Sequence, residues 1–148
     1  MRLLASLAAL VLLTACSSAG AAGSAPGDAA PRYRVVANAA YASATGTNAI
    51  VAADETAYRN TWSSMIGAGE APAVDFATET AVFLFGGERP TGGYSVAVRG
   101  VRVEGDTLVV DGSVNAPPPD AMSTQAITSP YAVIAVKTRG VRNVRWNP

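Results

Sequence analysis

The sequence contains no histidine, one cysteine and one lysine, and each shortage excludes a class of function. Without histidine the chain cannot build a Ser-His-Asp triad, a Cys-His pair or a histidine-ligated metal site. A single cysteine cannot form a disulfide within the chain. Eleven Lys and Arg residues are balanced by eleven Asp and Glu residues. Because no basic excess is present to neutralise phosphates, we expect no binding of nucleic acid.

The acid–base groups that remain form no recognisable catalytic pattern. Most carboxylates fall where turns and helix caps are expected, and no motif places a serine beside the lone lysine, Lys137. We therefore predict a protein that is not an enzyme, with no cofactor, no metal and no catalytic residue. A carboxylate-based enzyme or a Ser–Lys137 pair is the alternative least favoured by the sequence.

The N-terminal residues are typical of an export signal. Met1 and Arg2 are followed by an apolar run over residues 3–13, which is too short to span a bilayer as a helix. The next residues, Leu13-Thr14-Ala15-Cys16, resemble the bacterial lipobox, in which the cysteine receives a diacylglycerol. This pattern predicts a signal peptide at residues 1–15 and a lipidated Cys16. An ordinary secretory signal with a chance cysteine is the alternative.

Residues 16–31 are almost entirely Ser, Ala, Gly and Pro after the cysteine and predict a disordered tether. The expected partner of this region is a membrane, reached through the lipid on Cys16, and the expected location is the cell envelope. The lipobox resemblance implies that Ser17, just after the cysteine, would not favour retention at an inner membrane, so the expected place in a Gram-negative cell is the periplasmic face of the outer membrane.

Residues 32–148 predict one mainly β domain of the α+β class. Asp54 is a suitable N-cap, and Tyr58, Trp62 and Ile66 recur on one face of a helix over residues 55–66. Short β-prone runs surround this helix, with a bulge expected at Gly100 and a hairpin turn at 104–107. The predicted strands are 32–37, 48–52, 80–85, 94–103, 108–114, 131–137 and 141–146. Their spacing favours a small antiparallel sandwich or a partly open barrel with the helix packed on it.

A glycine-rich loop separates the most apolar of these runs from the next one. Residues 81–85 are continuously apolar, and residues 86–93 then hold four glycines and Pro90. Proline fixes its own φ, and glycine accepts positive φ, so this composition specifies a shaped loop. Our candidate partner-binding loop comprises Arg89, Pro90, Thr91, Gly92, Gly93 and Tyr94. The simpler alternative is that these residues only form a hairpin turn.

Four motifs in order carry a family resemblance: Val74-Asp75-Phe76, residues 81–85, residues 89–96 and residues 128–134. Together with the helix before them and the proline-rich stretch at 116–120, they resemble the C-terminal domain of the PrcB family over roughly residues 50–145. The resemblance implies a lipoprotein that acts as a non-catalytic, accessory or stabilising subunit of a secreted protease. It assigns no catalytic residue.

The loop is also similar to the Pro-Thr-Thr-Gly-Tyr loop of chagasin-type inhibitors of cysteine proteases, although Gly92 stands where those proteins have a threonine. This similarity implies an alternative function in which residues 90–94 enter a protease active site. A purely structural role in the envelope is not distinguished from partner binding by the sequence. The sequence does not indicate the identity of the partner or the oligomeric state.

Overall fold

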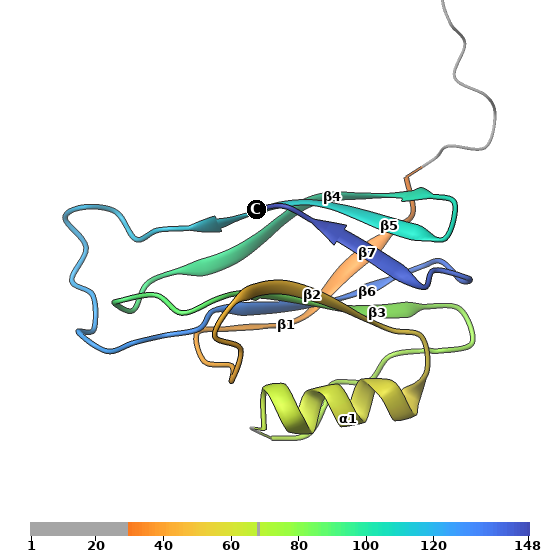
Figure 1. Cartoon of the computed structure of the whole chain (residues 1–148), viewed down its shortest axis with the longest axis horizontal. Coiled ribbons are helices and arrows are strands. Elements are labelled where there is room, and N and C mark those ends of the chain that lie inside the picture. The colour runs from red at the N-terminus through yellow and green to blue at the C-terminus, as the bar shows by residue number, and fades with distance from the viewer. Residues whose placement is uncertain (1–29, 68) are drawn as a thin grey trace, which may run out of the picture.

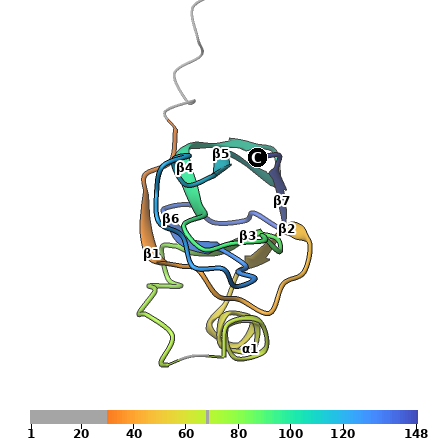
Figure 2. The same ribbon diagram turned by 90° about the vertical axis from the view of Figure 1, so that its left-hand side faces the viewer.

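Seven strands form two sheets that face each other, and one helix covers the outer side of one sheet (Figures 1 and 2). The computed structural model describes residues 30–67 and 69–148. The predicted signal peptide, Cys16 and nearly all of the predicted tether lie outside these residues. The elements in chain order are β1 (Tyr33–Ala39), β2 (Thr47–Ala52), α1 (Glu55–Met65), β3 (Thr80–Gly86), β4 (Ser95–Glu104), β5 (Thr107–Asn115), β6 (Tyr131–Val136) and β7 (Asn143–Trp146).

The two sheets have the orders β1-β6-β3-β2 and β4-β5-β7. The predicted mainly β sandwich with one packed helix is confirmed. The expectation of a wholly antiparallel structure is wrong at one place, because β5 and β7 pair in parallel, with Leu108 opposite Val144. The chain crosses to the other sheet to form β6 before it returns as β7, and such a crossover permits a parallel pair.

Strands β3 and β6 are central and buried on both faces, which explains their continuous apolar sequences. On the helix side, Phe83, Phe85 and Val133 pack with Tyr58 and Trp62 of α1. The helix begins as predicted, since the Asp54 carboxylate accepts a hydrogen bond from the Ala57 backbone N–H at 2.8 Å. Its aromatic face is therefore core, and the helix ends one residue earlier than expected, with Ile66 as its C-cap.

The other faces of β3 and β6 meet the second sheet. Val82, Leu84 and Ile134 pack there against Leu108 and Val110. The predicted bulge is confirmed by a register shift between Val98 and Gly100, and the predicted hairpin turn is confirmed between β4 and β5. The edges of the two sheets approach each other on both sides of the sandwich, where β1 contacts β4 and β2 contacts β7. Within the described part of the chain, the only helix is too short to cross a membrane.

Candidate functional site: the loop end of the sandwich

Three loops gather at one end of the sandwich, which lies on the left in Figure 1. They comprise residues 40–46, 87–94 and 116–130, and we call this region the loop end. The last residues of the third loop run between the other two. Ser129 exchanges backbone hydrogen bonds with the 40–46 loop through the Ala40 carbonyl and the Ala42 N–H, and Arg89 and Thr128 bond each other in both directions. The loop end is therefore a single hydrogen-bonded unit.

The 87–94 loop is not the hairpin turn that the sequence left as an alternative. It leaves β3 in one sheet and enters β4 in the other, so it crosses the sandwich rather than reversing within a sheet. Gly87 and Gly93 have φ values of 73° and 84°, in the left-handed region that favours glycine. These two glycines therefore set the path of the loop between the two sheets, as the glycine-rich composition of the loop predicted.

The 116–130 loop supports the 87–94 loop through hydrogen bonds. The Gly92 backbone N–H donates to the Thr124 carbonyl at 2.8 Å, and the Thr128 hydroxyl donates to the Thr91 carbonyl at 2.7 Å. A Cβ added at Gly92 would meet the Thr124 hydroxyl at 2.8 Å, and one added at Gly93 would meet the Pro117 ring at the same distance. Gly92 is buried, so the 116–130 loop covers part of the surface that the sequence assigned to a partner.

Some of the other residues predicted to bind a partner support the loop, and others are exposed to solvent. The Arg89 guanidinium donates to the Gly86 carbonyl at 2.6 Å and lies over the Tyr94 ring, 5.7 Å from its centroid. Both side chains are half-buried, as is Thr91, whereas Pro90 and Gly93 are exposed. Arg89 and Tyr94 therefore hold the loop in shape, and Pro90 is the predicted residue that is presented most directly to solvent.

The structure adds apolar residues that our sequence reasoning missed. Met122 is fully exposed, and Ile127 and Tyr41 expose 68% and 61% of their surfaces. Each belongs to the loop end, where Tyr41 bridges Ser129. Exposed large apolar side chains that share one region are typical of protein-binding surfaces. The signal in the sequence was a methionine and an isoleucine in a polar stretch without periodicity, just after the proline-rich residues 116–120.

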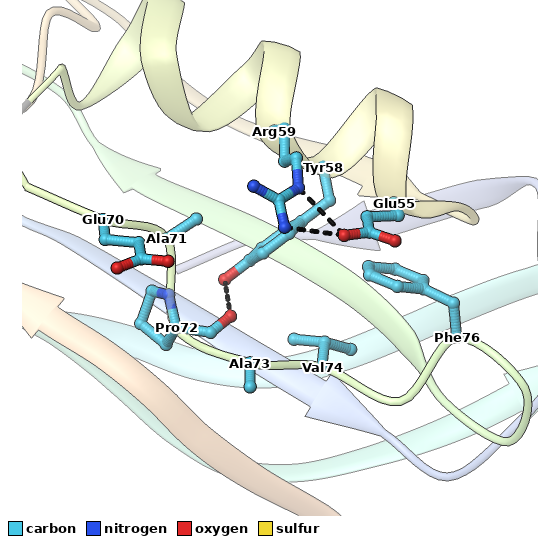
Figure 3. A pocket seen from close by; sticks show the side chains of 9 residues that line it. All are labelled: Glu55, Tyr58, Arg59, Glu70, Ala71, Pro72, Ala73, Val74 and Phe76. Atoms are coloured by element: carbon cyan, nitrogen blue, oxygen red, sulfur yellow. Dashed lines mark hydrogen bonds and ion pairs between the residues drawn. The ribbon is translucent and has the colours of Figure 1, made fainter.

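Apart from the loop end, a hollow of about 450 Å³ lies between α1 and the segment that follows it (Figure 3). Most of its polar side chains already have partners. The Tyr58 hydroxyl donates to the Pro72 carbonyl at 3.0 Å, and Arg59 forms an ion pair with Glu55 at 2.7 Å. Burial raises the pKa of Tyr58, so its hydroxyl stays protonated as a donor. The hollow thus lies between the helix and residues 70–76, and its one ion pair among the described residues joins two side chains of the helix itself.

Among the described residues, no group of three or more Cys, Asp and Glu side chains is placed to hold a metal ion. Glu79 is the least exposed of the carboxylates that form ion pairs among the described residues, and its pKa is lowered mainly by hydrogen bonds from Arg34. Glu79 also accepts from the Asp75 backbone N–H, so it anchors the segment before β3. Its role is structural.

Fold and loop end together define a two-sheet β-sandwich domain with an apolar, hydrogen-bonded set of loops at one end. The comparison with family models gives a narrower assignment: residues 80–137, from the start of β3 to just beyond β6, match the family described as PrcB C-terminal. Over these residues the chain is similar to that family. No curated protein and no solved structure matches the chain.

The match confirms the predicted resemblance over the part of the chain that holds most of the loop end. It includes the 87–94 loop, the 116–130 loop and strands β3 to β6. The expected extent of residues 50–145 is longer than the matched one, so α1 and the Val74–Phe76 motif lie outside it. The 40–46 loop is also outside the match, although it is bonded to Ser129 within it.

Proposed function

We propose that this protein is a non-catalytic accessory subunit that docks a secreted or envelope protease through its loop end. The single observation that carries this proposal is the exposed apolar set Tyr41, Met122 and Ile127 on loops that are held together by hydrogen bonds. A docking surface needs exposed apolar area on a frame that loses little freedom on binding. The match to a PrcB C-terminal region supports a protease as the partner.

We further propose that the domain is held at the membrane by lipid on Cys16, after removal of residues 1–15. Two or more acyl chains give stable anchoring where a single chain would not. The envelope location of the partner and of this protein follows from that anchor. Labelled palmitate should be incorporated into the wild-type chain in cells and not into Cys16→Ser, with the label retained on the N-terminal peptide. Recovery of unmodified Cys16 from the mature protein would contradict the anchor.

The docking proposal is tested by in-cell crosslinking of the anchored protein, followed by mass spectrometry. The variant Met122→Ser/Ile127→Ser should lose most of the crosslinked partner, because it removes apolar contact area without touching a buried residue. Val35→Ser/Val103→Ser is the matched control, since these residues are also exposed and apolar but lie in strands β1 and β4. Equal losses in both pairs, or a crosslinked partner that is not a protease, would contradict the proposal.

A second candidate function is inhibition of a cysteine protease by the 90–94 loop. The observation that favours it is the placement of two further loops beside this one, which the sequence did not reveal. In this case Pro90 and Gly93, the exposed members of the loop, contact the active site. The purified protein should then inhibit at sub-micromolar concentration in a panel of papain-like and subtilisin-like proteases. Full protease activity across the panel removes this candidate.

A further inference from the structure

Four exposed cations gather at the end of the domain where the described chain begins: Arg32, Lys137, Arg139 and Arg142. The Lys137 backbone N–H donates to the Arg32 carbonyl at 2.7 Å, which fixes the turn between β6 and β7 beside the start of β1. Figure 1 shows both segments at the end opposite the loop end. Among the described residues, none of these four side chains has an ion-pair partner, whereas five other arginines do.

The neighbouring sheet adds little negative charge to cancel these cations. Glu104 is shared by Arg102 and Arg145, so this group of three carries one surplus positive charge. Asp106 is the carboxylate that the structure links to this region, since its carbonyl accepts from the Arg142 N–H. Its side chain accepts from Asn143 and Thr107. Asp75 and Glu79 precede β3 at this same end, and Asp54 follows β2 there, since Thr80 lies opposite Val136 and Ala52 opposite Ala81. Glu79 is paired with Arg34, so the cations still outnumber the carboxylates at this end, by a small margin.

The opposite layer of the molecule carries the balancing negative charge. Asp54, Glu55, Glu70 and Asp75 are exposed on α1 and on the segments that flank it. Figure 2 shows α1 on one side of the sandwich, while the described chain begins beside the β4-β5-β7 sheet on the other. The exposed carboxylates therefore lie mainly on the α1 side of this end, and the described chain begins on the other side.

We infer that this cationic end docks on anionic phospholipid headgroups. The inference rests on the proposed lipid anchor at Cys16. The Ser, Ala, Gly and Pro composition of residues 16–31 predicts a tether, and a flexible chain of that length has an r.m.s. span of about 20 Å, which would keep this end of the domain close to the bilayer. A cation beside an anionic leaflet raises partition about fivefold. Docking in this orientation turns the loop end away from the membrane and presents it to a partner.

The test couples the chain of residues 16–148 through its single thiol, Cys16, to a maleimide-bearing lipid in vesicles. All contacts that the structure describes lie after residue 29, so this chain retains them. Energy transfer from the two tryptophans to dansyl-labelled headgroups reports docking. We expect greater transfer in vesicles with about 30% phosphatidylglycerol than in phosphatidylcholine alone, and loss of the difference at about 0.5 M salt.

The variant Lys137→Gln/Arg139→Gln/Arg142→Gln should lower the ratio of docked to undocked domains about a hundredfold, at fivefold per cation. These residues are exposed, so thermal unfolding of the variant should match the wild type. The control is Asn60→Glu/Ser63→Glu/Ser64→Glu, which makes an equal change in net charge on the exposed face of α1. This control should dock like the wild type.

Transfer that ignores lipid charge would overturn the inference, and so would a control that loses as much as the triple variant. Release of the docked domain by a soluble acidic peptide, at the same total charge as the lipid, would point to an acidic protein as the occupant and would also overturn it. Because the anchor is supplied chemically, failure here leaves lipidation of Cys16 untouched. Conversely, an unmodified Cys16 in cells refutes the anchor without changing the vesicle result.

Discussion

Replacing Thr128 with valine should loosen the loop end and weaken partner capture. The Thr128 side chain is 2% exposed, and its hydroxyl donates to the Thr91 carbonyl at 2.7 Å. Valine has almost the same volume but cannot donate, so the Thr91 carbonyl loses its bond from the third loop. The change therefore tests whether the 116–130 loop holds the 87–94 loop in its binding shape.

The magnitude follows from the burial of the bond. Removing one partner of a buried hydrogen bond and leaving the other without one costs about 1–3 kcal/mol. For a domain of this size, about 1 kcal/mol shifts the unfolding midpoint by about 4 °C, so the expected fall is about 4–12 °C. The shape of the valine side chain leaves no cavity to add to this cost.

Thr80→Val is the matched control for this prediction. Thr80 is 3% exposed, and its hydroxyl donates to the Thr138 carbonyl at 2.9 Å, in the turn at the far end of the sandwich. Both variants should lose similar stability. The amide hydrogen exchange of Arg89 and Gly92 should become faster only in Thr128→Val, because these amides donate to the 116–130 loop. Less partner should be crosslinked in the same variant, and not in Thr80→Val.

Two results would refute this reasoning. If Gly92 exchange is unchanged in Thr128→Val while stability falls, the 87–94 loop does not depend on the hydroxyl. If Thr80→Val reduces partner capture as much as Thr128→Val, the effect on binding comes from global stability rather than from the loop end.

Three further predictions concern the frame of the domain. Glu79→Gln should cost about 1 kcal/mol at pH 6. Because Arg34 lowers the folded-state pKa of Glu79, its contribution is present above the unfolded-state pKa and is lost as the pH falls through the folded-state pKa, so urea unfolding of the two proteins should converge once the pH lies below that lowered pKa. Trp62→Asp should unfold the domain, because it places an unpaired charge in the core, and loss of the near-ultraviolet circular dichroism would show it. Gly93→Ala should cost about 1–3 kcal/mol through its positive φ and its contact with the third loop, whereas Gly46→Ala, with open space at its Cβ, should leave the melting temperature within about 2 °C.

Local sequence patterns predicted most of the elements because their causes are local. The Asp54 cap and the aromatic repeat at Tyr58 and Trp62 specify a helix wherever it packs. Gly100 marks the bulge in β4 because the parity of its apolar residues changes there. The motif order likewise indicated the PrcB C-terminal region that the family comparison finds at residues 80–137.

The candidate site was predicted only in part, because some of its residues are covered or support the loop in the folded chain and only some are exposed. The composition of residues 89–94 marked a shaped loop, and the structure shows that Gly92 is covered while Arg89 and Tyr94 support the crossing. The exposed side chains of Met122 and Ile127 were missed because an apolar residue in a loop looks the same whether it packs inward or faces solvent.

The sequence by itself therefore indicated the set of elements, the family resemblance and the predicted lipid anchor at Cys16, and each of these rests on residues that are neighbours in the chain. Only the tertiary structure decided that the 87–94 loop crosses between sheets, that β7 runs parallel to β5, and that four cations without an ion-pair partner among the described residues lie on segments at the end opposite the apolar loops. Those facts depend on which segments, far apart in the chain, pack against each other. Because hydrophobic burial is non-directional, the local pattern of one segment does not specify the segment against which it packs.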